Sequence, residues 1–140
     1  MRQTVLGLVV GVLLLALASG VALAATKYST DGPDKLFGTK GDVIYGYGSD
    51  DLIFGRAGSD DLRRGSGSDS IDTSPCGYDV VHGGSGNDSI DVTFSCIYTA
   101  EYPPPPLQTN VVNCGPGFDK VQEAQREDEI STNCEGVTRP

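Results

Sequence analysis

Aliphatic residues recur at a fixed interval between Phe37 and Asp91, and polar or mixed residues flank each of them. The interval is nine residues over six successive blocks, with one extra residue, Thr73, before the fifth. The blocks read FGTKGDVIY, GYGSDDLIF, GRAGSDDLR, RGSGSDSID, SPCGYDVVH and GGSGNDSID. Position eight of the blocks is always aliphatic: Ile44, Ile53, Leu62, Ile71, Val81 and Ile90. A strict repeat of this kind is typical of solenoid proteins.

Each block combines a glycine-rich first half with a three-residue second half. Successive side chains of a strand point to opposite faces, so position eight is predicted to face inward and positions seven and nine outward. Asp61, Arg63 and His82 occupy such outward positions, which fits the assignment. The sequence therefore predicts an all-β fold in which turns alternate with very short parallel strands around a thin aliphatic column.

An aspartate occupies position six of every block. These aspartates are Asp42, Asp51, Asp60, Asp69, Asp79 and Asp88. The chain has a net charge of −9 at pH 7, which argues against nucleic acid as a partner and favours cations. A narrow aliphatic column buries little apolar surface, and this burial does not offset the entropy lost when the chain is ordered. In addition, stacked aspartates repel one another. We therefore expect a cation to bind between the turns.

Calcium is the cation that these residue types favour. Every acidic residue between Phe37 and Asp91 is an aspartate, and the glycines allow neighbouring carbonyls to turn inward. Carboxylate and carbonyl oxygens together suit Ca²⁺, which takes about 6–8 oxygen ligands. Zinc would need Cys or His, and His82 is the single histidine of the chain. Mg²⁺ is less suited to a flexible cage of protein oxygens.

The block GGSGNDSID at Gly83–Asp91 matches the pattern G-G-x-G-x-D-x-U-x, so the repeat region resembles the RTX, or haemolysin-type, calcium-binding repeats. The resemblance implies a parallel β-roll in which two repeats make one coil. It also implies several Ca²⁺ ions between turns stacked on the same edge. One edge would use Asp42, Asp60 and Asp79, and the other Asp51, Asp69 and Asp88. Asp119, in the repeat-like segment 115–121, is a further candidate ligand.

Carbonyls of the turn glycines would complete these sites, on the same resemblance. The glycines are Gly46, Gly48, Gly58, Gly65, Gly67, Gly83, Gly84 and Gly86. Some blocks depart from the pattern, because Lys40 and Ser49 replace the glycine of position four. In addition, Arg63 and Arg64 bring positive charge to the fourth turn, and Cys76 disturbs the fifth block.

The four cysteines form two pairs of equal separation, and each pair begins beside a glycine in a repeat-like turn. This arrangement resembles the Cys-Gly…Asp-x-Val…Cys-Glu endings of secreted bacterial proteins with such repeats. The resemblance favours local disulfides, Cys76–Cys96 and Cys114–Cys134, among the three connectivities that four cysteines allow. A cysteine metal site is the alternative, although the chain has no C-x-x-C. Residues 123–130 are expected to form a short helix or an irregular end cap.

The N-terminus has the features of a secretory signal peptide. A short basic start is followed by an apolar run from Val5 to Leu23 and by the small-x-small sequence Ala22-Leu23-Ala24. The alternative is a membrane anchor, since about 20 apolar residues can span a bilayer. The sequence is expected to divide into a signal peptide (1–24), a lead-in segment (25–36), the repeat region (37–91), an insertion with the prolines Pro103–Pro106 (92–110), and a degenerate repeat with a disulfide-closed cap (111–140).

These features predict a secreted calcium-binding protein that folds into a β-roll around its ions. We expect no catalytic activity, because the chain has neither H-E-x-x-H nor G-x-S-x-G. Paired carboxylates acting on a glycoside, or an accessory domain of a hydrolase, are the enzymatic alternatives. A third hypothesis is an extracellular interaction or adhesion module, with calcium purely structural and a surface at Tyr45 and Phe54 or at the proline loop. No membrane contact is expected after signal removal. The sequence is compatible with a protein or cell-surface partner but does not identify one.

Overall fold

The computed structural model describes residues 24–73, 77–93, 109–122 and 124–140. These residues form β-strands and no helix. One sheet, called sheet A, contains β1 (Thr26–Tyr28), β3 (Val43–Gly48), β5 (Asp61–Ser66), β7 (Val80–Ser85), β9 (Val111–Asn113) and β11 (Glu129–Ile130). The other, sheet B, contains β2 (Lys35–Phe37), β4 (Leu52–Phe54), β6 (Ser70–Asp72), β8 (Ser89–Asp91), β10 (Lys120–Gln122) and β12 (Gly136–Val137).

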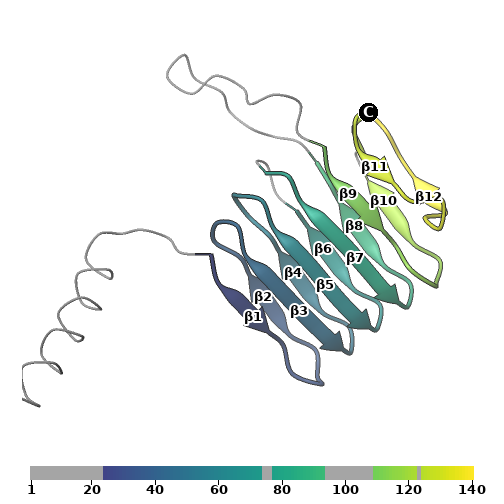
Figure 1. The fold of residues 1–140 in the computed structure, drawn as a ribbon. Helices are drawn as coiled ribbons and strands as arrows, with labels where there is room; N and C mark the ends of the chain where they lie inside the picture. Colours follow the sequence, from purple (N-terminus) through teal and green to yellow (C-terminus); the bar gives the residue numbers. More distant parts are fainter. Residues whose placement is uncertain (1–23, 74–76, 94–108, 123) are drawn as a thin grey trace, which may run out of the picture.

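Consecutive strands alternate between the two sheets, and all neighbouring strands within a sheet are parallel. Each coil of the chain therefore adds one strand to each sheet, which is the parallel β-roll predicted from the repeats. Figure 1 shows the coils stacked in sequence order, with β1 and β2 at one end and β11 and β12 at the other. Two blocks of nine residues make one coil, so that β3 lies beside β5 with Ile44 opposite Leu62.

The aliphatic residues of position eight form the core, as predicted. Ile44, Ile53, Leu62, Val81 and Ile90 are fully buried, and Ile71 is nearly so. The register places these side chains directly above one another, Ile53 opposite Ile71 and Ile71 opposite Ile90 in sheet B. Val112 and Val121 continue the two columns into the C-terminal part. The core is thus two aliphatic columns, one from each sheet, packed between the sheets.

The roll begins earlier and ends later than the repeat pattern indicated. The nine-residue repeat begins at Phe37, whereas β1 and β2 already form a coil within residues 26–37. Hydrogen-bond partners on neighbouring coils are 18 or 19 residues apart earlier in the roll, whereas Asp79 and its partner Asn110 are 31 residues apart. Strand β9 then pairs with β7, so the roll resumes after the insertion. The proline loop itself lies outside the described residues.

The C-terminal coil is closed by the disulfide Cys114–Cys134, which confirms that predicted pair. Its Cα atoms are 5.4 Å apart, and Cys114 is completely buried against the core. The predicted bond Cys76–Cys96 lies outside the described residues. Residues 124–130 contain turns and strand β11 rather than the short helix considered from the sequence. Within the described residues no helix is long and apolar enough to cross a membrane, and residues 1–23 are not among them.

Candidate metal centre

The first row of acidic residues lies at the turns that lead into sheet A, and we call it ladder A. Its members each precede a strand of that sheet: Asp42, Asp60, Asp79, Asn110 and Asp128. The backbone N–H of each member donates a hydrogen bond to Oδ1 of the next. The distance is 2.7 Å from Asp42 to Asp60, and 2.9 Å from Asp60 to Asp79. The same bond joins Asp79 to Asn110 at 3.1 Å and Asn110 to Asp128 at 2.8 Å.

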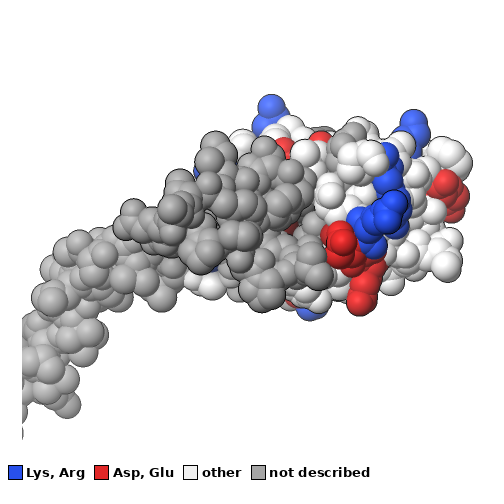
Figure 2. Space-filling model, turned by 90° about the horizontal axis from the view of Figure 1, so that it is seen from above, with Lys and Arg blue, Asp and Glu red and all other residues white. Residues whose placement is uncertain are grey.

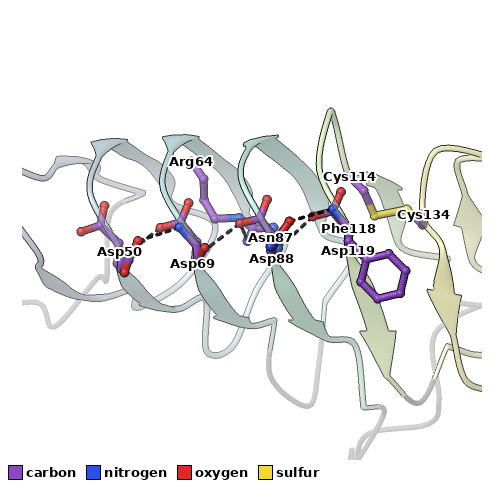
Figure 3. A network of polar contacts seen from close by, with 11 residues as sticks. Asp50, Arg64, Asp69, Asn87, Asp88, Cys114, Phe118, Asp119 and Cys134 are labelled. Carbon is purple, nitrogen blue, oxygen red and sulfur yellow. Dashed lines mark hydrogen bonds and ion pairs between the residues drawn. A yellow bond between two sulfur atoms is a disulfide. The ribbon is translucent and has the colours of Figure 1, made fainter.

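The second row, ladder B, lies on the opposite edge, at the turns that lead into sheet B. Its members are Asp34, Asp51, Asp69, Asp88 and Asp119. Their N–H groups donate to Oδ1 of the next aspartate at 2.8–2.9 Å, from Asp34 along the row to Asp119. Figure 3 shows Asp69, Asp88 and Asp119 following one another along this edge. At the end of the row, the N–H of Asp119 donates to Oε2 of Glu135 at 2.9 Å.

The structure therefore places the predicted aspartates on two edges, divided as the resemblance implied. It also adds residues that the sequence analysis missed, namely Asp34, Asn110, Asp128 and Glu135. A signal for them exists in the sequence. Asn110 and Asp128 are followed two residues later by Val112 and Ile130, which repeats the spacing from position six to position eight. The residues directly before Asn110 and Asp128 contain no glycine, so these two segments do not match the glycine-rich repeat pattern.

Burial changes the acidity of the ladder carboxylates. The aspartates at position six of the blocks are all at most 4% exposed. Removal from water disfavours the charged form, and it raises the pKa of Asp60 and Asp69 to about 6 and that of Asp79 to about 7. Donated backbone hydrogen bonds oppose this rise, while neighbouring carboxylates add to it. Burial also raises the pKa of Asp51 and Asp88. The ladders are thus rows of buried carboxylates whose charged form is unfavourable, and a bound cation would stabilise that charged form.

Several of these carboxylates have an oxygen without a partner. Oδ2 of Asp60, Asp88 and Asp119 is buried and accepts no hydrogen bond. An unsatisfied buried polar atom costs about 1–3 kcal/mol, and more when it is charged. Such unpartnered buried oxygens fit a hard cation such as Ca²⁺, which prefers oxygen ligands.

Asp42, at the open end of ladder A, differs from the central aspartates. Its Oδ1 accepts from the N–H of Ala25, and its Oδ2 accepts from both N–H and Oγ1 of Thr39. The Lys27 ammonium lies 3.3 Å from Oδ2. Burial alone would raise the pKa of Asp42, but these hydrogen bonds together hold it below its ordinary value. Asp42 is therefore satisfied by the protein itself.

The turn glycines allow the backbones of successive coils to approach closely. A Cβ on Gly86 would lie 1.7 Å from the carbonyl oxygen of Gly67, and a Cβ on Gly84 would lie 2.0 Å from that of Gly65. Positive φ angles of 134° at Gly86 and 83° at Gly84 also favour glycine there. Carbonyl oxygens of one turn therefore point at the next turn. Among the predicted carbonyl ligands, Gly58 precedes Asp60 of ladder A. The others precede members of ladder B: Gly46, Gly48, Gly65, Gly83 and Gly84 lie in the last residues of β3, β5 and β7, and Gly67 and Gly86 directly follow β5 and β7. The Gly46 carbonyl already accepts a hydrogen bond from Oγ of Ser29 at 2.6 Å.

Side chains alone do not form a metal site in the described part of the chain. No three His, Cys, Asp or Glu side chains there come together closely enough to hold one ion. Because the ladder aspartates are buried, the described surface seen in Figure 2 carries both acidic and basic side chains despite the negative charge of the chain.

The remaining acidic residues of the repeats lie nearer the surface. Asp50 is exposed and accepts a hydrogen bond from the N–H of Ser68 at 2.7 Å, and Asp61 forms an ion pair with Arg63. His82 is exposed on sheet A. Tyr45 and Phe54 do not share a surface, since they lie on different sheets. Tyr45 stacks on Tyr28 at a centroid distance of 5.3 Å, whereas Phe54 stacks on Phe37 at 5.1 Å.

The fold and the two ladders define a class of protein, a parallel β-roll with carboxylates buried along both edges. The model of the RTX calcium-binding nonapeptide repeat matches the chain in four copies, over residues 28–62, 38–71 and 77–92. These residues match RTX calcium-binding repeats, and together with the parallel β-roll the match supports calcium binding by this part of the chain. The matches begin at Tyr28, in agreement with the early first coil, and end before Asn110 and Asp119. Searches of curated proteins and of solved structures found no match.

Proposed function

We propose that this chain is an extracellular protein whose β-roll is stabilised by several Ca²⁺ ions bound between successive turns. The observation that carries the proposal is the unpartnered, buried Oδ2 of Asp60 and Asp88 in turns of RTX repeats. Calcium supplies a divalent charge that offsets the mutual repulsion of the ladder carboxylates. The chain supplies the oxygens and holds them in register through the strands.

The ligands would come from the two ladders. Asp60 and Asp79 would hold ions on one edge, and Asp51, Asp69, Asp88 and Asp119 on the other, together with the turn carbonyls. Asp42 would contribute least, since Lys27, Thr39 and Ala25 already satisfy it. Burial of the ladder aspartates also supports an ionic role over catalysis, because carboxylates such as those of Asp79 and Asp88 accept hydrogen bonds from backbone N–H groups of the preceding turn instead of lining an open site.

A calcium titration of the chain beginning at Ala25 tests this function. In calcium-depleted buffer we expect a weaker β signal in far-UV circular dichroism and a less stable roll than with calcium, and a cooperative gain of β signal as Ca²⁺ is added. Isothermal titration calorimetry should give several ions per chain, and Mg²⁺ at the same concentration should not reproduce the change. Unchanged spectra together with no heat of binding would refute the proposal.

Secretion is the second part of the proposal. The described roll starts directly after the small-x-small sequence, since the N–H of Ala25 donates to Asp42 at 2.7 Å and its carbonyl accepts from Val43 at 2.9 Å. Cleavage before Ala25 would thus leave the first coil intact and place the new α-ammonium beside the Asp42 carboxylate. Expression of the full chain in a bacterium, followed by intact mass measurement of the exported protein, tests this. Recovery of the whole chain in the membrane fraction would favour an anchor instead.

A further inference from the structure

A single arginine lies inside the roll. Arg64 occupies position one of its block, and the same position holds Gly46 in the preceding coil and Gly83 in the following one. Its side chain is 0% exposed. The two flanking glycines have no side chains, so they leave space between the sheets in which the long arginine side chain fits. A Cβ on Gly46 would already lie 3.3 Å from the Arg64 Cα.

The Arg64 guanidinium points at ladder B, as Figure 3 shows. Its Nη1 lies 3.5 Å from Oδ1 of Asp88. None of its three nitrogens has a hydrogen-bond partner. Burial lowers the pKa of Arg64, whereas the carboxylates of Asp88, Asp69 and Asp119 act to raise it. An arginine buried without hydrogen bonds is costly unless surrounding charges compensate it. Here three successive members of ladder B provide the compensation.

The neighbouring arginine serves as an internal comparison. Arg63 is exposed on the outer face of sheet A, where its Nε and Nη2 donate to the Asp61 carboxylate at 3.0 and 2.7 Å. Its guanidinium also lies 5.6 Å from the ring of Tyr45. Two adjacent residues of the same type thus have opposite environments. Of these two arginines, Arg64 is the one whose guanidinium lies beside a buried ladder carboxylate.

We propose that Arg64 is a built-in cation that takes the place of one calcium ion in ladder B, between residues 64–69 of one coil and residues 83–88 of the next. This inference rests on the proposed calcium-dependent fold. A guanidinium carries one charge and cannot be released, so it stabilises these two turns whether or not calcium is present. Position one of a turn faces the interior, and replacement of glycine by arginine there supplies the cation from the chain itself. The other turns of both ladders still require bound Ca²⁺ to offset the charge of their carboxylates.

The test compares calcium stoichiometry in four forms of the chain beginning at Ala25. Arg64→Gly restores the glycine found at positions 46 and 83 and is expected to bind one more Ca²⁺ than wild type. Arg64→Lys keeps the positive charge and should bind the wild-type number. Arg63→Ser is the matched control and should also bind the wild-type number. In calcium-depleted buffer, Arg64→Gly should lose amide protection in residues 64–91 that wild type retains.

The possible results separate this inference from the proposed function. Equal, non-zero stoichiometry for wild type and Arg64→Gly would overturn the role of Arg64 and leave the calcium-binding function standing. Failure of Arg64→Gly to fold in saturating calcium, judged by circular dichroism, would also overturn it, because the inference requires that an ion can replace the guanidinium. Absence of calcium binding in all four forms would refute the proposed function itself.

Discussion

The backbone N–H of Asp79 donates to Oδ1 of Asn110 at 3.1 Å, in the geometry with which Asp60 donates to Asp79 at 2.9 Å. The amide of asparagine thus replaces a carboxylate in ladder A without breaking the row of hydrogen bonds. What Asn110 lacks is the negative charge. The structural and the ion-binding roles of a ladder residue are therefore separable.

The first prediction follows from this substitution. Asp79→Asn should leave the stability of the calcium-free protein close to that of wild type, because its amide oxygen still accepts from Asp60. Calcium affinity should fall by about tenfold or more at the affected site, which corresponds to about 1.4 kcal/mol. Asp79→Ala should in addition destabilise the calcium-free protein by about 1–3 kcal/mol, since the buried N–H of Asp60 loses its acceptor. Calorimetric titration and urea unfolding measure the two effects, and equal calcium-free stabilities for the Asn and Ala variants would contradict the argument.

The second prediction concerns pH. Folding raises the pKa of Asp60 and Asp69 to about 6 and of Asp79 to about 7, above the ordinary value of 3.8. The folded chain therefore binds more protons than the unfolded chain in the range between these values. The stability contributed by these protons is fully present below about pH 3.8 and is lost as the pH rises through 6 to 7. Asp42, with its lowered pKa, acts in the opposite direction.

Calcium-free protein should accordingly be more stable at about pH 5 than at about pH 8, and saturating calcium should abolish or reverse the difference. Thermal unfolding followed by circular dichroism across this range measures it. The double variant Asp60→Asn/Asp79→Asn is the control and should show a flatter dependence. If the midpoint temperature of unfolding of the calcium-free protein rises with pH, the buried carboxylates do not dominate the pH dependence of stability.

The third prediction concerns the close approach of the turns. A methyl group on Gly86 would lie 1.7 Å from the carbonyl oxygen of Gly67, at a φ of 134°. Gly86→Ala should therefore destabilise the calcium-bound protein by at least about 2 kcal/mol and weaken calcium binding at this turn. Gly32→Ala is the matched control, because its Cβ would meet Oγ1 of Thr30 at 3.8 Å, an ordinary contact. Urea unfolding in saturating calcium should separate the two variants, and equal midpoints would count against the described turn geometry.

The fourth prediction concerns the C-terminal coil. Strand β12 is two residues long, and the N–H groups of Gly136 and Thr138 bond to the carbonyls of Asp119 and Val121 at 2.9 Å. The disulfide Cys114–Cys134 holds this short strand beside β10. Its removal in Cys114→Ala/Cys134→Ala should cost about 3 kcal/mol. Amide exchange should then speed up at Gly136 and Thr138 and stay unchanged at Leu62 in β5. Uniform loss of protection throughout the roll would indicate that the disulfide stabilises more than this end.

Much of the fold could be predicted from the sequence because its repeat is local. The nine-residue spacing of Ile44, Ile53 and Leu62 specifies turn, strand and inward face at once, and the structure has these residues in the predicted columns. The division of Asp60 and Asp51 between two edges follows from the same spacing. The first coil was missed because Lys27 stands where an aliphatic residue is expected, opposite Ile44.

The tertiary structure alone decided what surrounds the Arg64 side chain inside the roll, and which ladder oxygens lack partners. Arg63 and Arg64 have the same chemistry, but strand alternation turns one outward and the other into space left by Gly46 and Gly83 on neighbouring coils. Asn110 joins Asp79 across a separation of 31 residues, which no short pattern contains. The sequence by itself thus determined the period and the strand faces and favoured calcium over other cations, because these depend on near neighbours. The charge balance inside the roll depends on residues one coil away, and only the stacking of the coils brings those together.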